Sequence, residues 1–181
     1  MEAINVALTD KMTLEEAKEK FIHEWGTIGS KWGINKTMAQ VHALLLISPD
    51  ALCADEIMEQ LNISRGNANM NLRALIDWRL IKKVHKSGER KEFFFAEKDI
   101  WKIARQVVKQ RKRRELEPLR QILSELKDSV EVTNEETAVF HKTVEDLSEF
   151  SDLADKALEL MVQSEKSWMF NNLLKALTKD K

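Results

Sequence analysis

The predicted helix that follows Ser64 carries side chains that could hydrogen bond to nucleic-acid bases. They are three asparagines within five residues and one arginine, namely Asn67, Asn69, Asn71 and Arg73. Asparagine can form paired hydrogen bonds to adenine and arginine to guanine, and Gly66 allows a close backbone approach. Asparagine is a mediocre helix former, and an ordinary solvated face would use Glu, Lys or Gln instead. The composition therefore favours base contact.

A basic loop after this helix could contact phosphate groups. Lys86, Arg90 and Lys91 flank Gly88 in the predicted connection between two short strands. Cations on such a loop would straddle a phosphate backbone or enter the minor groove, which gives affinity with little sequence information. Arg65, at the start of the helix, could also meet phosphate. The predicted DNA-contacting residues are Ser64, Arg65, Gly66, Asn67, Asn69, Met70, Asn71, Arg73, Lys86, Arg90 and Lys91.

Positive charge is confined to the segment that contains these residues. Residues 64–114 hold 16 Lys and Arg against 5 Asp and Glu, whereas residues 1–63 hold 5 against 10 and residues 115–181 hold 8 against 15. The whole chain has a net charge of only −1. A basic block within an acidic molecule is typical of a surface that meets a polyanion, although a solvated helix face with a basic loop would look alike.

Helical periodicity and turn signals predict the elements that position these side chains. Thr13 and Glu16 form a candidate capping box at the start of a long first helix, which Gly33 ends. The other predicted helices span about 37–47, 54–61, 64–78, 99–126, 135–164 and 168–177, and the predicted strands span 80–84 and 92–96. Pro118 is expected either to kink one long helix or to begin a new one.

This order of elements predicts a mainly α fold, a winged helix-turn-helix with long N- and C-terminal dimerisation helices. We expect an N-terminal dimerisation helix over residues 1–34, a DNA-binding core over 35–98 and a C-terminal helical dimerisation region over 99–181. Within the recognition helix, a spacing of 100° per residue predicts that one face packs on the preceding helices. That face comprises Ala68, Leu72, Leu75 and Ile76.

Three stretches of the sequence resemble the GbsR branch of the MarR superfamily of bacterial transcriptional regulators. They are residues 21–26, 63–73 and 86–94. The resemblance implies a homodimeric repressor, with residues 64–78 in the major groove of double-stranded DNA and residues 86–91 against the backbone. Such sequences usually have glycine where this chain has Arg79, so Arg79 must tolerate a bend between the helix and the first strand.

Tryptophans and phenylalanines could line an effector cavity. Phe21 and Trp25 lie in the first helix, Trp101 follows the basic loop, and Trp168 and Phe170 lie near the end. Tryptophan faces attract quaternary ammonium groups, and the resemblance implies a small-molecule effector such as choline or another osmolyte. Aromatic residues at helical spacing more often belong to a hydrophobic core. We take Phe21, Trp25 and Trp101 as the candidate effector-binding residues.

Enzymatic chemistry has little support in the sequence. The chain has no glycine-rich phosphate loop, and His23, His42, His85 and His141 do not have a metal-ligand spacing. We expect no catalytic residue, metal or cofactor. Cys53 lies between Leu52 and Ala54, with the acidic residues Asp55 and Glu56 nearby, so it is interpreted as a packed structural residue and not as a reactive thiol.

Two functions remain after these exclusions. The first is a sequence-specific dimeric repressor; the second is a helical module that binds protein through a winged helix without reading DNA. The basic segment favours the first. The run Arg111–Arg114 either supports DNA approach or pairs with the acidic C-terminal third. With a longest apolar run of residues 43–47 and no signal segment, a cytoplasmic protein without membrane contact is expected.

Overall fold

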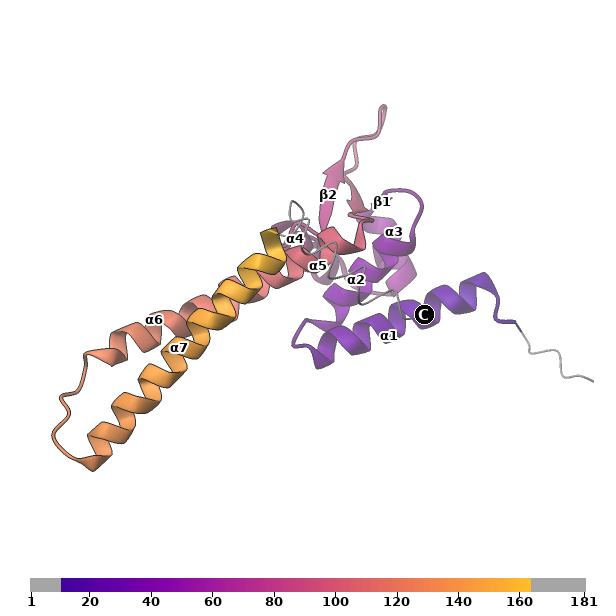
Figure 1. The fold of residues 1–181 in the computed structure, drawn as a ribbon. Coiled ribbons are helices and arrows are strands. Elements are labelled where there is room, and N and C mark those ends of the chain that lie inside the picture. The colour runs from indigo at the N-terminus through magenta and orange to yellow at the C-terminus, as the bar shows by residue number, and fades with distance from the viewer. Residues whose placement is uncertain (1–10, 164–181) are drawn as a thin grey trace, which may run out of the picture. The chain divides into compact units, whose positions relative to one another are not determined.

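The computed structural model describes residues 11–163, which form two compact units divided between Asp99 and Ile100. The first unit contains helices α1 to α4 and a small sheet, and the second contains only helices (Figure 1). The division of the chain by role, into dimerisation and DNA-reading segments, stays a prediction. The expected last helix, 168–177, lies outside the described residues.

Helix α1 (Leu14–Lys31) begins with the predicted capping box. The Thr13 backbone N–H donates to Glu16 Oε2 at 2.8 Å, and the Glu16 N–H donates to Thr13 Oγ1 at 3.3 Å. Gly33, with a φ of 72°, takes the left-handed conformation just after the helix ends. Two buried glycines, Gly26 and Gly29, allow α1 to lie close against α2.

Helix α2 (Lys36–Ile47) is the centre of the first unit. It begins at Asn35, whose side chain accepts from the Met38 N–H at 3.0 Å, and seven of its residues are buried. The Lys98 ammonium group donates to three carbonyl oxygens at the other end, those of Leu45, Leu46 and Ser48, at 2.7–2.8 Å. A cation at this position satisfies carbonyls that have no partner within the helix.

Helices α3 (Ala54–Leu61) and α4 (Arg65–Asp77) form the predicted helix-turn-helix. Asn62 takes a left-handed conformation, with a φ of 50°, and so makes the tight turn between them. The core that holds the pair is aliphatic. Its most buried large side chains are Val41, Leu45, Ile57, Leu72 and Leu75.

The predicted hairpin is confirmed as β2 (Ile81–Val84) and β3 (Phe93–Ala96), and a third strand joins it. Strand β1 (Leu52–Cys53) pairs antiparallel with β3, giving the order β1-β3-β2. Two residues are too few to show an alternating pattern, and so β1 left no signal in the sequence. Arg79 has a φ of 57°, which is the left-handed bend anticipated where a glycine was expected.

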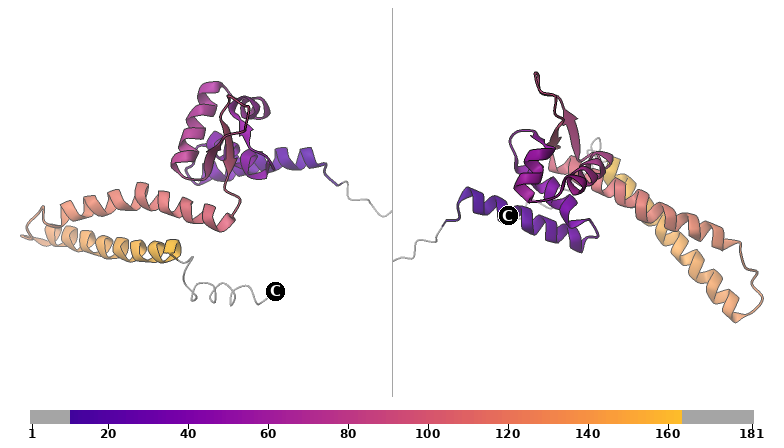
Figure 2. Two further views of the ribbon diagram at one scale, coloured as in Figure 1. Left: turned by 90° about the horizontal axis from the view of Figure 1, so that it is seen from above. Right: turned by 180° about the vertical axis from the view of Figure 1, so that it is seen from behind.

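The second unit is a helical hairpin. Helices α5 (Ile100–Arg111) and α6 (Glu117–Lys127) run as one helical segment joined by a π-helical turn, η1 (Lys112–Leu116), and α7 (Glu135–Gln163) returns beside them (Figure 2). Pro118 sits in the first turn of α6, so it neither ends the segment nor leaves it regular. A proline lacks the N–H for the i to i−4 bond, and the widened turn just before it is consistent with that loss.

Candidate nucleic-acid interface

Helix α4 is fixed at its start and along one face. The Ser64 hydroxyl accepts from the Asn67 N–H at 3.3 Å, which confirms Ser64 as the residue that caps the helix. Ala68, Leu72 and Leu75 are buried against the core, as the 100° spacing predicted, whereas Ile76 is only half-buried. This packing leaves the opposite face of α4 in solvent.

Most of the side chains predicted to contact DNA lie on that exposed face. Arg65, Gly66, Asn69, Met70 and Arg73 are all exposed, and Met70 is 58% exposed despite its apolar side chain. Space around Gly66 is open, because a Cβ placed there would meet no heavy atom within 4 Å. A close approach of another molecule to this part of the α4 backbone is therefore sterically allowed.

Asn71 does not belong to the exposed face. Its side chain is 2% exposed, and its Nδ2 group donates to the Asn67 carbonyl at 2.9 Å and to Asn67 Oδ1 at 2.6 Å. Residue 71 is three positions after Ala68 and four before Leu75, so it lies on the buried stripe of the helix. Asn71 therefore orients half-buried Asn67 and does not reach solvent. The prediction of a DNA contact for Asn71 rested on its residue type and not on its spacing from Ala68 and Leu75.

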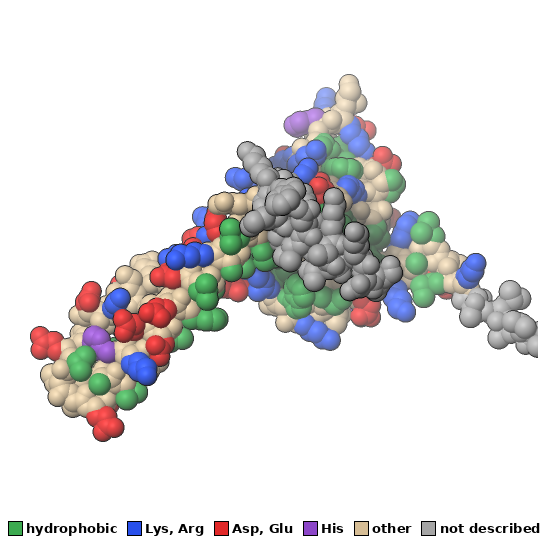
Figure 3. All heavy atoms as spheres, viewed as in Figure 1, with side chains coloured by type: hydrophobic (Ala, Val, Ile, Leu, Met, Phe, Trp, Pro, Cys, Tyr) green, Lys and Arg blue, Asp and Glu red, His purple; other side chains and the backbone are tan. Residues whose placement is uncertain are grey.

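The loop between β2 and β3, which we call the wing (residues 85–92), extends from the sheet with exposed basic side chains (Figures 1 and 3). Arg90 lies near the tip, where Gly88 has a φ of 83°. The base of the wing is anchored: Lys86 Nζ donates to the Ala51 carbonyl at 3.1 Å and lies 4.2 Å from the centroid of the Phe93 ring. Lys86 is thus both exposed and held in place.

Asp55 connects the wing to α4. Its Oδ1 atom lies 2.9 Å from Arg65 and its Oδ2 atom 3.1 Å from Lys91 Nζ. The hydrogen bond from Lys91 is the main reason why the pKa of Asp55 is lowered, and the same bond raises the pKa of Lys91. No local sequence pattern marks Asp55 as a link between the wing and α4, because its partners lie 10 and 36 residues away along the chain.

Cys53 and Glu56 stabilise the start of α3 next to this ion-pair cluster. The Cys53 backbone N–H donates to Glu56 Oε2 at 2.6 Å, and this hydrogen bond is the main cause that lowers the pKa of Glu56. Cys53 itself is 5% exposed and packs with Ala51 and Phe93. Its burial matches the interpretation of a structural cysteine.

The candidate effector residues fall into two groups. Phe21 and Trp25 are half-buried on α1, and their rings stack at 5.4 Å between centroids. Trp101 lies in α5, in the second unit, and is 57% exposed. The structure therefore brings two of the three together, and an effector site that joins them to Trp101 stays a prediction.

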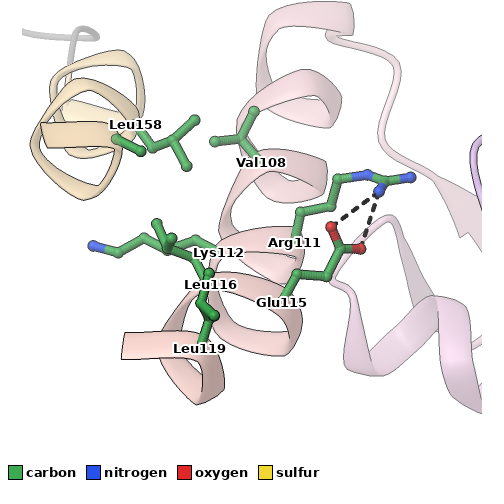
Figure 4. Close-up of a pocket in the computed structure, with 8 residues that line it drawn as sticks. Val108, Arg111, Lys112, Glu115, Leu116, Leu119 and Leu158 are labelled. Carbon is green, nitrogen blue, oxygen red and sulfur yellow. Dashed lines mark hydrogen bonds and ion pairs between the residues drawn. The ribbon is translucent and has the colours of Figure 1, made fainter. Parts of the chain in front are cut away.

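The basic run in the second unit pairs with acidic residues of that unit. Lys112 Nζ lies 3.0 Å from Asp155 and 2.8 Å from Glu159, both on α7, and Arg111 pairs with Glu115 one turn later at 3.0 Å. These bonds favour the pairing alternative for Arg111 and Lys112. Both side chains border a groove of about 350 Å³ (Figure 4). Its apolar lining is Val108, Leu116, Leu119, Ala154 and Leu158.

No helix in the described part of the chain is both long enough and apolar enough to cross a membrane. No family model matches the sequence.

Comparison with known proteins finds a similar sequence and a similar solved structure. The chain is 26% identical over 166 residues to the HTH-type transcriptional repressor GbsR of Bacillus subtilis (strain 168). The aligned region covers 91% of this chain and 85% of that protein. The resemblance to the GbsR branch is thereby confirmed. The crystal structure of a transcriptional regulator superposes with a TM-score of 0.57 at 16% identity, covering 81% of this chain and 99% of the other. That match supports the winged helix-turn-helix fold.

A second solved structure, wild-type Lactococcus lactis ZitR in complex with DNA, aligns at 20% identity over 77% of this chain and 98% of that one. Its TM-score of 0.32 is too low to bear on the fold.

Proposed function

We propose that this protein is a DNA-binding transcriptional regulator that acts as a sequence-specific dimeric repressor. The observation that carries the proposal is the exposed face of α4, which presents Asn69 and Arg73 from a capped and packed helix beside a basic wing. The similarity to a transcriptional repressor over 91% of the chain supports the same class of function. A winged helix that binds only protein would have no need for this cluster of cations.

In the proposed complex, α4 enters the major groove and the wing contacts the DNA backbone. Arg73 and Asn69 read bases, because guanidinium and amide groups can pair bidentately with guanine and adenine. Asn67 reaches the groove with its side chain oriented by Asn71. Arg90 meets phosphate or the minor groove from the tip of the wing, which contributes affinity for any sequence.

Dimerisation would place two α4 helices on successive major grooves, with half-sites about 10 base pairs apart. Support comes from α7, which carries large apolar side chains that the single chain leaves exposed. They are Val139, Leu147, Phe150, Leu153, Leu160 and Met161. A symmetric contact along this helix would remove apolar surface from water.

A compact quaternary ammonium compound is the effector we propose, on the basis of the stacked Phe21–Trp25 pair and the resemblance to GbsR. It would act by binding more tightly to one arrangement of the two α4 helices. The test is a titration of DNA-bound protein with choline and with a neutral isostere. If millimolar choline changes neither DNA affinity nor Trp fluorescence, these aromatic residues belong to the core.

Selection of bound duplexes from a random-sequence pool tests the main proposal. Purified full-length protein is expected to enrich an inverted repeat with half-sites about one helical turn apart. Arg73→Ala protein should lose the enrichment. If no sequence is enriched, because the protein binds all duplexes equally or binds none, the protein-binding alternative replaces the proposal.

A further inference from the structure

Asp55 uses both of its carboxylate oxygens on cations from two different elements. Oδ1 accepts from Arg65, the first residue of α4, and Oδ2 accepts from Lys91, at the end of the wing. The two cations therefore converge on one anionic group at 2.9 and 3.1 Å. Both elements that carry these cations are held in place. The Ser64 cap fixes the start of α4, and the hydrogen bond from Lys86 to the Ala51 carbonyl anchors the base of the wing.

A phosphodiester group resembles this carboxylate chemically. In a phosphodiester, one negative charge is distributed over two non-bridging oxygens, and Arg and Lys form charge-assisted hydrogen bonds with such oxygens. All three side chains are accessible: Arg65 is 72% exposed, Lys91 59% and Asp55 46%. A phosphate arriving from solvent can thus reach both cations.

We propose that Arg65 and Lys91 bind one and the same backbone phosphate of duplex DNA, and that Asp55 occupies this two-cation site in the free protein. The inference rests on the proposed DNA-binding function and deepens it. Because the helix that reads bases and the wing share this phosphate, it fixes the position of one relative to the other on the duplex. Asp55 competes with the phosphate and lowers the affinity for DNA of any sequence.

The shared phosphate is tested by replacing each phosphate of the selected duplex, one at a time, with an uncharged methylphosphonate. One phosphate in each half-site is expected to be the one that Arg65 and Lys91 bind, and replacing it should lower the affinity of the wild-type protein for the duplex. Arg65→Ala and Lys91→Ala proteins should both become insensitive at that same position. If the two variants become insensitive at different phosphates, the cations act separately and the inference is wrong.

The role of Asp55 is tested with Asp55→Asn, which keeps the shape of the side chain but removes its charge. We expect it to bind a mixed-sequence 30-base-pair duplex about two- to tenfold more tightly, since two exposed ion pairs no longer compete. Asp50→Asn removes one negative charge from an exposed position of the same unit and should give a much smaller change. The gain should disappear when Arg65 and Lys91 are both alanine.

Weaker or unchanged binding by Asp55→Asn would overturn the competitor role. Circular dichroism melting identifies a variant that fails to fold, and the methylphosphonate scan decides the shared site without Asp55→Asn. A wild-type protein that selects no duplex would defeat the proposed function. A protein that selects a duplex but fails the scan would defeat only the shared phosphate site.

Discussion

Arg73 and Arg90 carry the same guanidinium group but should make different contributions to DNA binding. Arg73 lies on the exposed face of α4 and Arg90 near the tip of the wing. If Arg73 reads a base, Arg73→Ala should cost about 1–3 kcal/mol on the selected duplex and little on mixed-sequence DNA. Arg90→Ala should weaken both and flatten the salt dependence. Fluorescence anisotropy over a range of salt measures these effects, and equal losses on both duplexes for both variants would contradict the roles.

His42 makes the stability of the first unit depend on pH. It is 5% exposed on α2, and burial, with a smaller contribution from the charge of Lys98, lowers its pKa to about 4. Within the described residues its Nε2 atom has no hydrogen-bond partner. The unfolded chain, with a His pKa near 6.5, binds more protons between about pH 6.5 and 4, so protonation favours unfolding there.

Stability should therefore fall as the pH drops through this window, and His42 should account for about 2 kcal/mol of the loss between pH 7 and pH 5. Urea denaturation at the two pH values measures it. In His42→Leu, which keeps an apolar group of similar size, the loss should be smaller by that amount. An equal pH dependence in both proteins would mean that His42 can take up a proton without cost.

At the scale of elements, the contact between α1 and α2 depends on a small residue. A Cβ at Gly29 would lie 2.6 Å from the Cβ of Ala39, so Gly29→Ala must push the helices apart. We expect it to lower the free energy of unfolding by about 1–3 kcal/mol. Gly66→Ala is the matched control, because it too is helical but its Cβ would enter open space. It should be neutral or slightly stabilising, and thermal melting of both variants separates the two outcomes.

At the scale of the whole molecule, dimerisation is expected to depend on the apolar face of α7. Phe150 and Leu153 are 69% and 67% exposed in the single chain. Replacing both with glutamate should yield a monomer at micromolar concentration and weaken binding to a two-half-site duplex, since each half-site then binds alone. Sedimentation velocity gives the oligomeric state. Lys142→Glu, at another exposed position of α7, should remain dimeric; a monomeric wild-type protein would refute the dimer.

Local signals in the sequence determined most elements of the fold. The capping box at Thr13, the cap at Ser64 and the β-branched and aromatic runs on either side of the wing each act over a few residues, so their patterns could be read directly. The same holds for the exposed position of Arg73, which follows from its spacing to the buried leucines. The bend at Arg79 was anticipated as well, because a family pattern placed glycine there.

Tertiary structure decided the contacts between residues far apart in the chain. The pairing of Asp55 with Lys91, the capping of α2 by Lys98 and the two-residue strand β1 all join segments more than 30 residues apart. No local pattern encodes such partners, since each depends on how the helices and the sheet pack. Asn71 lies between these cases: its type suggested a base contact, but its place on the buried stripe of α4 made it the residue that orients Asn67.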